Sequence, residues 1–273
     1  LKILGVHMLT PQNLNQKDGD LFMILLKERG SQYMKKAKKN KYLITAILTG
    51  KGGSKLKNKN IFKINGKPLL SYPCTAAKKV KEINNYFVSS ENKKILNLAE
   101  KYGYEKIVRP TALSKRNSLH KDVLVHAAKH LKRKKILPDI LVVLLANSAT
   151  IKTKWISQAI KLLKSHPKAT ACVPVIQDND HHPFRAKKID SNNYLKSFFK
   201  FKKKISSNRQ DLIANFFLCH NFWVLKTKAI FRNNGEAPWN FLGKKVLHLK
   251  INYSIDIHDE KDIYLTQEWL KNN

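Results

Sequence analysis

The sequence predicts an α/β fold in which helices cover a mostly parallel sheet. Apolar segments of strand length alternate with segments of about ten residues that have helical spacing, which is the order expected of βαβ units. The apolar segments also lack an alternating polar face, as expected of strands that are covered on both sides. The 273 residues are 42% hydrophobic, which suffices for one large core or two small ones.

The first half of this pattern begins at Tyr42. A glycine-rich loop follows the first apolar segment, and the helical spacing of 93–102 stops at Gly103, a common helix terminator. The most continuous apolar run is PDILVVLLA, over 138–146. The elements expected here are strand Tyr42–Leu48, helix Pro68–Val80, strand Asn85–Ser89, helix Lys93–Tyr102, strand Glu105–Val108, helix His120–Leu131 and strand Pro138–Ala146.

The second half of the pattern is interrupted once. Residues 178–210 are polar, lysine-rich and aromatic, with FFKFKKK at 198–204, and they predict an excursion from the sheet. The elements expected around this excursion are helix Trp155–Leu163, strands Ala169–Ile176, Phe216–Leu225 and Lys245–Ile251, and helix Asp259–Leu270.

Residues 1–41 have no sustained periodicity, so we expect them to be an N-terminal extension of a domain formed by residues 42–273. Met34 begins a segment typical of a natural start, which indicates that residues 1–33 are upstream sequence or poorly ordered. Two aspartates precede the first apolar run, and no run reaches the roughly 18–20 residues that span a bilayer. We therefore expect no secretory signal, no membrane contact and a cytoplasmic location. The three cysteines follow no metal-ligand pattern and are expected to be core thiols.

Charge is the most unusual feature of the composition. Lysine and arginine number 53 and aspartate and glutamate 19, which leaves a net charge of +34. Such a charge suits a polyanionic partner. However, lysine and asparagine together make 70 residues, against 26 for arginine, glycine and proline, so an A/T-rich genome explains much of the excess. No recognition helix, RNA-stacking motif or zinc module is apparent, and we expect no nucleic-acid partner.

The loop after the first expected strand is a candidate phosphate-binding element. Its sequence over 48–60 is LTGKGGSKLKNKN, which combines three glycines with four lysines. Glycines at this place in a parallel sheet let backbone N–H groups approach phosphate oxygens. The spacing matches neither the P-loop nor the dinucleotide-binding pattern, so neither function follows. A solvated, lysine-rich turn is the competing interpretation.

Seven segments can be compared with known families as an ordered set. They are TGKGGSKLKNKNI, YFVSSE, Arg109-Pro110, SLHKDVLVHA, LLANSATIK, HHP and SIDIHDEKDI. In this order, over about residues 42–270, the chain resembles the acylneuraminate cytidylyltransferases, or CMP-sialic acid synthetases. The resemblance implies a three-layer α/β/α nucleotidyltransferase fold, Rossmann-like, in which residues 178–210 form a small insertion for dimerisation and sugar binding.

The resemblance also implies a reaction, in which CTP and a nonulosonic acid give a CMP-sugar and pyrophosphate for cell-surface glycan synthesis. It implies Mg²⁺ or Mn²⁺ as cofactor and a homodimer as the assembly. By position, Lys51, Lys59 and Asp256 become the candidate catalytic residues. The candidate substrate-binding residues are Gly50, Gly52, Gly53, Ser54, Lys55, Arg109, Ser118, His120, Asn147, His182, Arg185 and Arg209.

Several positions depart from the family pattern. The family's metal-binding D-x-D is Asp256-Ile257-His258 here, so the candidate metal ligands are Asp256 and, less suited to Mg²⁺, His258. Lys51 replaces an arginine, which keeps the charge but loses the planar grip on phosphate. Glu91 and Arg116 replace aspartates. Three functions stay open: transfer of CMP to a nonulosonic acid, transfer to another acid acceptor such as a different 2-keto sugar acid or a phosphonate, and nucleotide binding without turnover.

Overall fold

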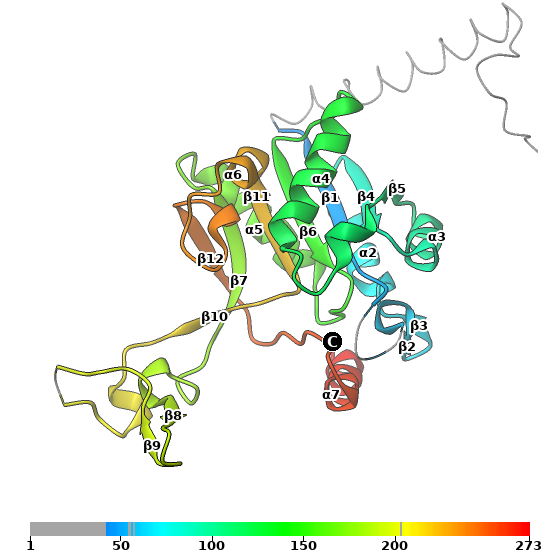
Figure 1. The fold of residues 1–273 in the computed structure, drawn as a ribbon. Coiled ribbons are helices and arrows are strands. Elements are labelled where there is room, and N and C mark those ends of the chain that lie inside the picture. The colour runs from blue at the N-terminus through cyan, green and yellow to red at the C-terminus, as the bar shows by residue number, and fades with distance from the viewer. Residues whose placement is uncertain (1–41, 54–55, 57, 203) are drawn as a thin grey trace, which may run out of the picture. The chain divides into compact units, whose positions relative to one another are not determined.

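The apolar segments of the chain assemble into one large mixed sheet (Figure 1). The structure, a computed structural model, describes residues 42–53, 56, 58–202 and 204–273, and the sheet belongs to the unit Ile44–Asn273. The expected N-terminal extension, 1–41, lies outside the described residues. The strands are β1 (Ile44–Thr49), β4 (Asn85–Ser90), β5 (Glu105–Val108), β6 (Ile140–Leu145), β7 (Ala171–Gln177), β10 (Phe216–Leu218), β11 (Phe222–Lys226) and β12 (Val246–Lys250).

The strand order places the ends of four parallel strands together. Along the sheet the order is β10-β7-β11-β6-β1-β4-β5, and β12 pairs with β7. β1 pairs in parallel with β4 and β6, and β5 pairs in parallel with β4, whereas β11 runs antiparallel between β6 and β7. Thr49 at the end of β1 lies opposite Ser89 on one side and Leu145 on the other. The carboxyl ends of β1, β4, β5 and β6 therefore share one edge, which is where open α/β sheets bind ligands.

Helices cover both faces of the sheet, which gives the predicted three layers (Figure 1). Two helices, α4 and α6, lie on one face, two others, α2 and α5, lie on the opposite face, and α3 packs against β4 and β5. The helix bounds are α2 (Ser71–Lys78), α3 (Lys93–Lys101), α4 (His120–Arg133), α5 (Thr153–Ser165), α6 (Thr227–Arg232) and α7 (Glu260–Lys271).

One part of the core lies between the sheet and α4. The helix has buried apolar residues three and four positions apart, so Leu124, Ala127 and Leu131 form one face toward the strands. They pack in a cluster with Ile47 of β1 and Trp223 of β11. The predicted α/β fold with a mostly parallel sheet is thus confirmed, and its core fixes the strands whose ends form the site.

The helix expected over Pro68–Val80 begins later than predicted. A two-stranded hairpin, β2 (Lys63–Ile64) and β3 (Lys67–Pro68), precedes α2, and Pro68 belongs to it. The hairpin turn is Asn65-Gly66, and both residues have positive φ angles, of 47° and 76°. An Asn-Gly pair favours such a turn because both residues tolerate the left-handed conformation.

The strand expected over Phe216–Leu225 is interrupted and forms β10 and β11. Leu218 pairs with Val175 and Val224 with Cys172, so a separation of six residues along this segment faces a separation of three along β7, and the intervening residues form a bulge. The interruption lies beside Pro174 of β7, which has no N–H to donate to a neighbouring strand.

Between β7 and β10 the described residues add no strand to the large sheet. They form a separate two-stranded sheet of β8 (Lys187–Ile189) and β9 (Leu195–Ser197), which fits the predicted excursion. The three cysteines are buried free thiols, as expected of core residues. Within the described ranges, no helix combines the length and the apolar character needed to cross a membrane.

Candidate active site

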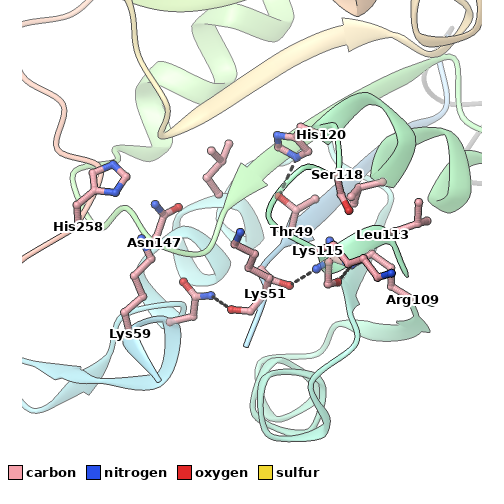
Figure 2. A pocket seen from close by; sticks show the side chains of 15 residues that line it. Thr49, Lys51, Lys59, Arg109, Leu113, Lys115, Ser118, His120, Asn147 and His258 are labelled. Carbon is pink, nitrogen blue, oxygen red and sulfur yellow. Dashed lines mark hydrogen bonds between the residues drawn. The ribbon is translucent and has the colours of Figure 1, made fainter. Parts of the chain in front are cut away.

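A pocket of about 290 Å³ opens at the edge where the parallel strands end (Figure 2). It lies at the end of β1 and takes further residues from the loops after β5 and β6 and from the segment before α7. Figure 2 shows His120 and Ser118 on one side of Lys51, and Lys59, Asn147 and His258 on the other. The predicted residues that line the pocket are Gly50, Lys51, Lys59, Arg109, Ser118, His120, Asn147 and His258.

The glycines of the first loop have different surroundings. A Cβ on Gly50 would lie 3.0 Å from the Cβ of Ala146, so only glycine fits there without displacing the end of β6. A Cβ on Gly52 would lie 2.3 Å from the Nδ2 of Asn92, whereas one on Gly53 would meet no atom of the described residues within 4 Å. Gly52 and Gly53 are both described by the structure, and neither lines the pocket. The other two predicted loop residues, Ser54 and Lys55, lie outside the described part of the chain.

Two lysines of the loop bring positive charge to the pocket. Lys59 donates a hydrogen bond from Nζ to the carbonyl oxygen of Ile257, 2.6 Å away. Burial lowers the pKa of Lys59, and the charge of Lys51 acts in the same direction, while Asp256 opposes both. The backbone of Lys51 is fixed because its carbonyl oxygen accepts a bond of 2.9 Å from the Nδ2 of Asn60. The loop therefore presents two ammonium groups from a braced backbone.

Arg109 is tied into the protein by an ion pair rather than extended into solvent. Its Nη2 lies 2.7 Å from the Oε2 of Glu91, and the two side chains are 4% and 14% exposed. Burial raises the pKa of Glu91, but hydrogen bonds from Ser114, Gly52 and Arg109 outweigh it and hold the pKa below its usual value. The pair is ionised at neutral pH and closes the side of the pocket next to β4 and β5.

His120 lies against the end of β1 as a neutral imidazole. Its Nε2 is 3.2 Å from the Oγ1 of Thr49, and its ring lies 5.2 Å from the ring of Trp223. Burial, with smaller contributions from Arg109 and His220, lowers the pKa of His120 to about 4. The hydroxyl of Ser118 is occupied by the carbonyl oxygen of Ala112, 2.8 Å away. His120 and Ser118 therefore bring no charge to this side of the pocket near neutral pH.

The two candidate metal ligands lie side by side. The Nε2 of His258 is 3.1 Å from the Oδ2 of Asp256, while the Oδ1 of Asp256 is buried with no hydrogen-bond partner among the described residues. Burial raises the pKa of Asp256, against the opposing charges of His258, Lys59 and His220. Mg²⁺ is commonly held by one or two carboxylates together with substrate phosphates. Asp256 itself does not line the pocket and its Oδ1 is buried, so only the partly exposed side of this carboxylate suits that role, whereas the imidazole of His258 does not.

The residues expected to bind the acid sugar lie in the excursion and do not line this pocket. Both ring nitrogens of His182 are used locally: Nε2 lies 3.1 Å from the carbonyl oxygen of Ile213, and Nδ1 accepts from the backbone of Phe184. Arg185 and Arg209 both contact Asp180. Arg209 also lines a second hollow of about 480 Å³ at the base of the excursion.

The pocket also contains residues that the sequence did not single out. They are Asn60, Leu113, Ser114 and Lys115, besides Thr49, Val123 and Leu145. Lys115 adds a third lysine, and Ser114 completes the bonding around Arg109. Ser114 and Lys115 could have been found from their position just after Arg109-Pro110. From the sequence, only the arginine of that motif was considered.

Comparison with known proteins shows which family the chain matches. Residues 46–236, more than half of the chain, match the cytidylyltransferase family model. A curated relative from Helicobacter pylori is 26% identical over 170 residues, which are 62% of this chain and 32% of the relative. It is named pseudaminic acid cytidylyltransferase and UDP-2,4-diacetamido-2,4,6-trideoxy-beta-L-altropyranose hydrolase. The chain thus spans about a third of the length of that relative.

Solved structures share the fold at low identity. CMP:2-keto-3-deoxy-manno-octonic acid synthetase complexed with CTP superposes with a TM-score of 0.62 at 10% identity, over 84% of this chain and 99% of that one. The 4-diphosphocytidyl-2C-methyl-D-erythritol synthase of Anaerococcus prevotii gives 0.58 at 17% identity, over 84% and 96%. These likenesses concern the fold, while the family match concerns the sequence itself. On that match, the chain belongs to the cytidylyltransferase family of enzymes.

Proposed function

We propose that the chain transfers CMP from CTP to a nonulosonic acid, a sialic-acid-like sugar, and releases pyrophosphate. The observation that carries this proposal is a lysine-lined pocket at the carboxyl edge of the sheet in a member of the cytidylyltransferase family. The Helicobacter pylori relative supports the sugar class, since its name contains pseudaminic acid cytidylyltransferase. The synthetase complexed with CTP supports the nucleotide, at the level of a shared fold.

The residues of the pocket suit a phosphoryl transfer. An acceptor hydroxyl oxygen attacks the α-phosphorus of CTP, the bond to the bridging oxygen of the β-phosphate breaks, and the hydroxyl proton passes to water as pyrophosphate leaves. Catalysis of this kind consists mainly of positioning and of stabilising negative charge. Lys51, Lys59 and Lys115 supply the positive charge that stabilises it. An ammonium group has three donors, so Lys59 can keep its bond to Ile257 and still offer two to phosphate oxygens.

A divalent cation fits this site through Asp256. The partly exposed carboxylate of Asp256, rather than its buried Oδ1, would hold Mg²⁺ or Mn²⁺ together with oxygens of the triphosphate, since no group of three or more metal-ligating side chains occurs among the described residues. When bound, the cation would neutralise charge on the leaving pyrophosphate. The role of the chain is to keep the Asp256 carboxylate ionised, for which the positive charge of Lys59 is suited.

The same proposal includes a homodimer formed through the excursion. Apolar side chains are exposed on and beside β8 and β9, including Ile189 at 65%, Leu195 at 71% and Phe198 at 56%. Apolar side chains gathered on one exposed segment are typical of an interaction surface. Because His182, Arg185 and Arg209 do not line the pocket of their own chain, a second copy is the partner that would bring them to a sugar.

The test is an assay of pyrophosphate release. The full chain is incubated with Mg²⁺ or Mn²⁺, each of the four nucleoside triphosphates, and a panel of nonulosonic acids, other 2-keto sugar acids and phosphonates. We expect release with CTP and a nonulosonic acid only. Release with CTP and a different acid acceptor would show that the acceptor is not a nonulosonic acid. Binding of CTP without release by any acceptor would favour a relative that has lost turnover, as the change of the family's second metal-binding aspartate to His258 permits.

A further inference from the structure

The carboxylate of Glu91 joins three segments behind the pocket. Its Oε1 accepts the backbone N–H of Gly52 at 2.7 Å. Its Oε2 accepts from the Nη2 of Arg109 at 2.7 Å and from the hydroxyl of Ser114 at 2.6 Å. Glu91 follows the end of β4, whereas its partners come from the loops after β1 and β5. One side chain therefore holds two walls of the pocket to each other.

Arg109 is bound from the other side as well. Its Nη2 donates to the carbonyl oxygen of Gly50 at 2.9 Å, and its Nε donates to the hydroxyl oxygen of Ser114 at 3.0 Å. These bonds use the Nε–H and both hydrogens of Nη2. They leave Nη1 with no hydrogen-bond partner in the described part of the chain, on a side chain that lines the pocket.

We propose that Glu91 is a positioning residue for the nucleotide: it fixes the guanidinium of Arg109 and the Gly50–Gly52 turn in the arrangement that receives CTP. Glu91 itself does not line the pocket, so it acts through its partners. The effect is strong because the pair is almost enclosed, where hydrogen bonds to charged groups are tighter and a missing partner is costly. This inference rests on the proposed function.

Glu91→Gln tests the carboxylate. The amide retains one oxygen that can accept and replaces the other with a donor. In either orientation that donor would face an N–H, of Arg109 or of Gly52, so the substitution breaks the link that the carboxylate makes between the two walls and removes its charge. We expect the Kd for CTP, measured by titration calorimetry, to rise by about tenfold.

A double-mutant cycle distinguishes positioning from an independent contribution. Arg109→Met is expected to raise the Kd by more than Glu91→Gln does. If Glu91 acts through Arg109, the double variant binds CTP no more weakly than Arg109→Met alone. If the double variant shows the product of the two single effects, the inference is overturned. Because Arg109→Met leaves a buried carboxylate without its partner, Ser114→Ala is the second route: it removes one anchor of the pair, and its Kd should rise by about threefold.

The control is Glu100→Gln, which removes a carboxylate paired with Lys106 on the surface. Its Kd for CTP should equal that of the unmodified chain. A merely structural role of Glu91 would lower the melting temperature of Glu91→Gln and leave the Kd unchanged well below that temperature, and this result overturns the inference. Failure of the unmodified chain to bind CTP at all would instead overturn the proposed function.

Discussion

The ammonium group of Lys59 is the side chain on which the proposed chemistry depends most. It reaches the pocket wall from the first loop. Its half-buried position lowers its pKa, and the negative charge of Asp256 acts in the opposite direction and favours the charged ammonium. Lys59→Met removes one donor to the phosphates, and we expect kcat for pyrophosphate release to fall by about a hundredfold. Lys63→Met, an exposed lysine of the same segment, is the matched control and should leave kcat unchanged. Equal rates for both variants would contradict the role of Lys59.

The neutral imidazole of His120 predicts how stability depends on pH. The unfolded chain takes up a proton at this residue near pH 6.5, but the folded chain does so only near pH 4. Between these values the unfolded state binds more protons, so the free energy of unfolding falls as the pH falls, by up to about 1.4 kcal/mol per unit. Urea unfolding at pH 4.5 and 7 should show a smaller difference for His120→Gln than for the unmodified chain. An unchanged difference would show that His120 is not responsible.

At the scale of residues, motif order predicted which side chains gather but not what they bind. Lys51, Lys59 and Arg109 were candidates through the family resemblance, and they line the pocket because their segments follow parallel strands. The contacts of Glu91 were not predictable, because they require the ends of β1, β4 and β5 to lie within a hydrogen bond of one another. Lys115 was missed because lysine is so common in this chain that a single one carries no signal.

At the scale of elements, the loop after β1 can be tested with two neighbouring glycines. A Cβ on Gly52 would collide with Asn92, whose side chain caps α3 by accepting from Lys94 and Ile95. Gly52→Ala should therefore lower the free energy of unfolding by about 1–3 kcal/mol and weaken CTP binding. Gly53→Ala meets no described residue within 4 Å and should change stability by less than about 0.5 kcal/mol. Similar effects of the two substitutions on urea unfolding would contradict this account of the loop.

The elements were predictable where one periodicity persisted and less so where local geometry intervened. Buried strands such as β1 and β6 follow from continuous apolar runs, and α4 follows from its apolar spacing. The β2–β3 hairpin escaped prediction because its strands have only two residues each, although Asn65-Gly66 was a usable signal. The break between β10 and β11 lies beside a proline in a different strand, which no window of local sequence includes.

At the scale of the whole molecule, the net charge of +34 has few specific uses. Three lysines line the pocket with Arg109, and many of the remaining basic residues lie on exposed helix faces and loops. These positions favour a small polyanion such as a triphosphate as the ligand. The salt dependence of CTP binding should accordingly be modest in comparison with that of a nucleic-acid complex.

The proposed homodimer is also a property of the whole molecule. Light scattering should give twice the chain mass of 31.5 kDa. Leu195→Asp places a charge on the most exposed apolar position of β9 and should shift the protein toward the monomer, because burying an unpaired carboxylate in an interface is costly. Leu137→Asp, outside the excursion and 37% exposed, is the control and should remain dimeric. A single-chain mass for the unmodified protein would contradict the dimer.

Label transfer tests the central claim most directly. CTP labelled at the α-phosphorus is incubated with the full chain, a divalent cation and a nonulosonic acid, and the products are separated. The account predicts that the label moves to a CMP-sugar while unlabelled pyrophosphate is released, and that Lys59→Met suppresses both. Label that stays on CTP, or that moves equally well from UTP, would contradict the assignment of this pocket to CMP transfer.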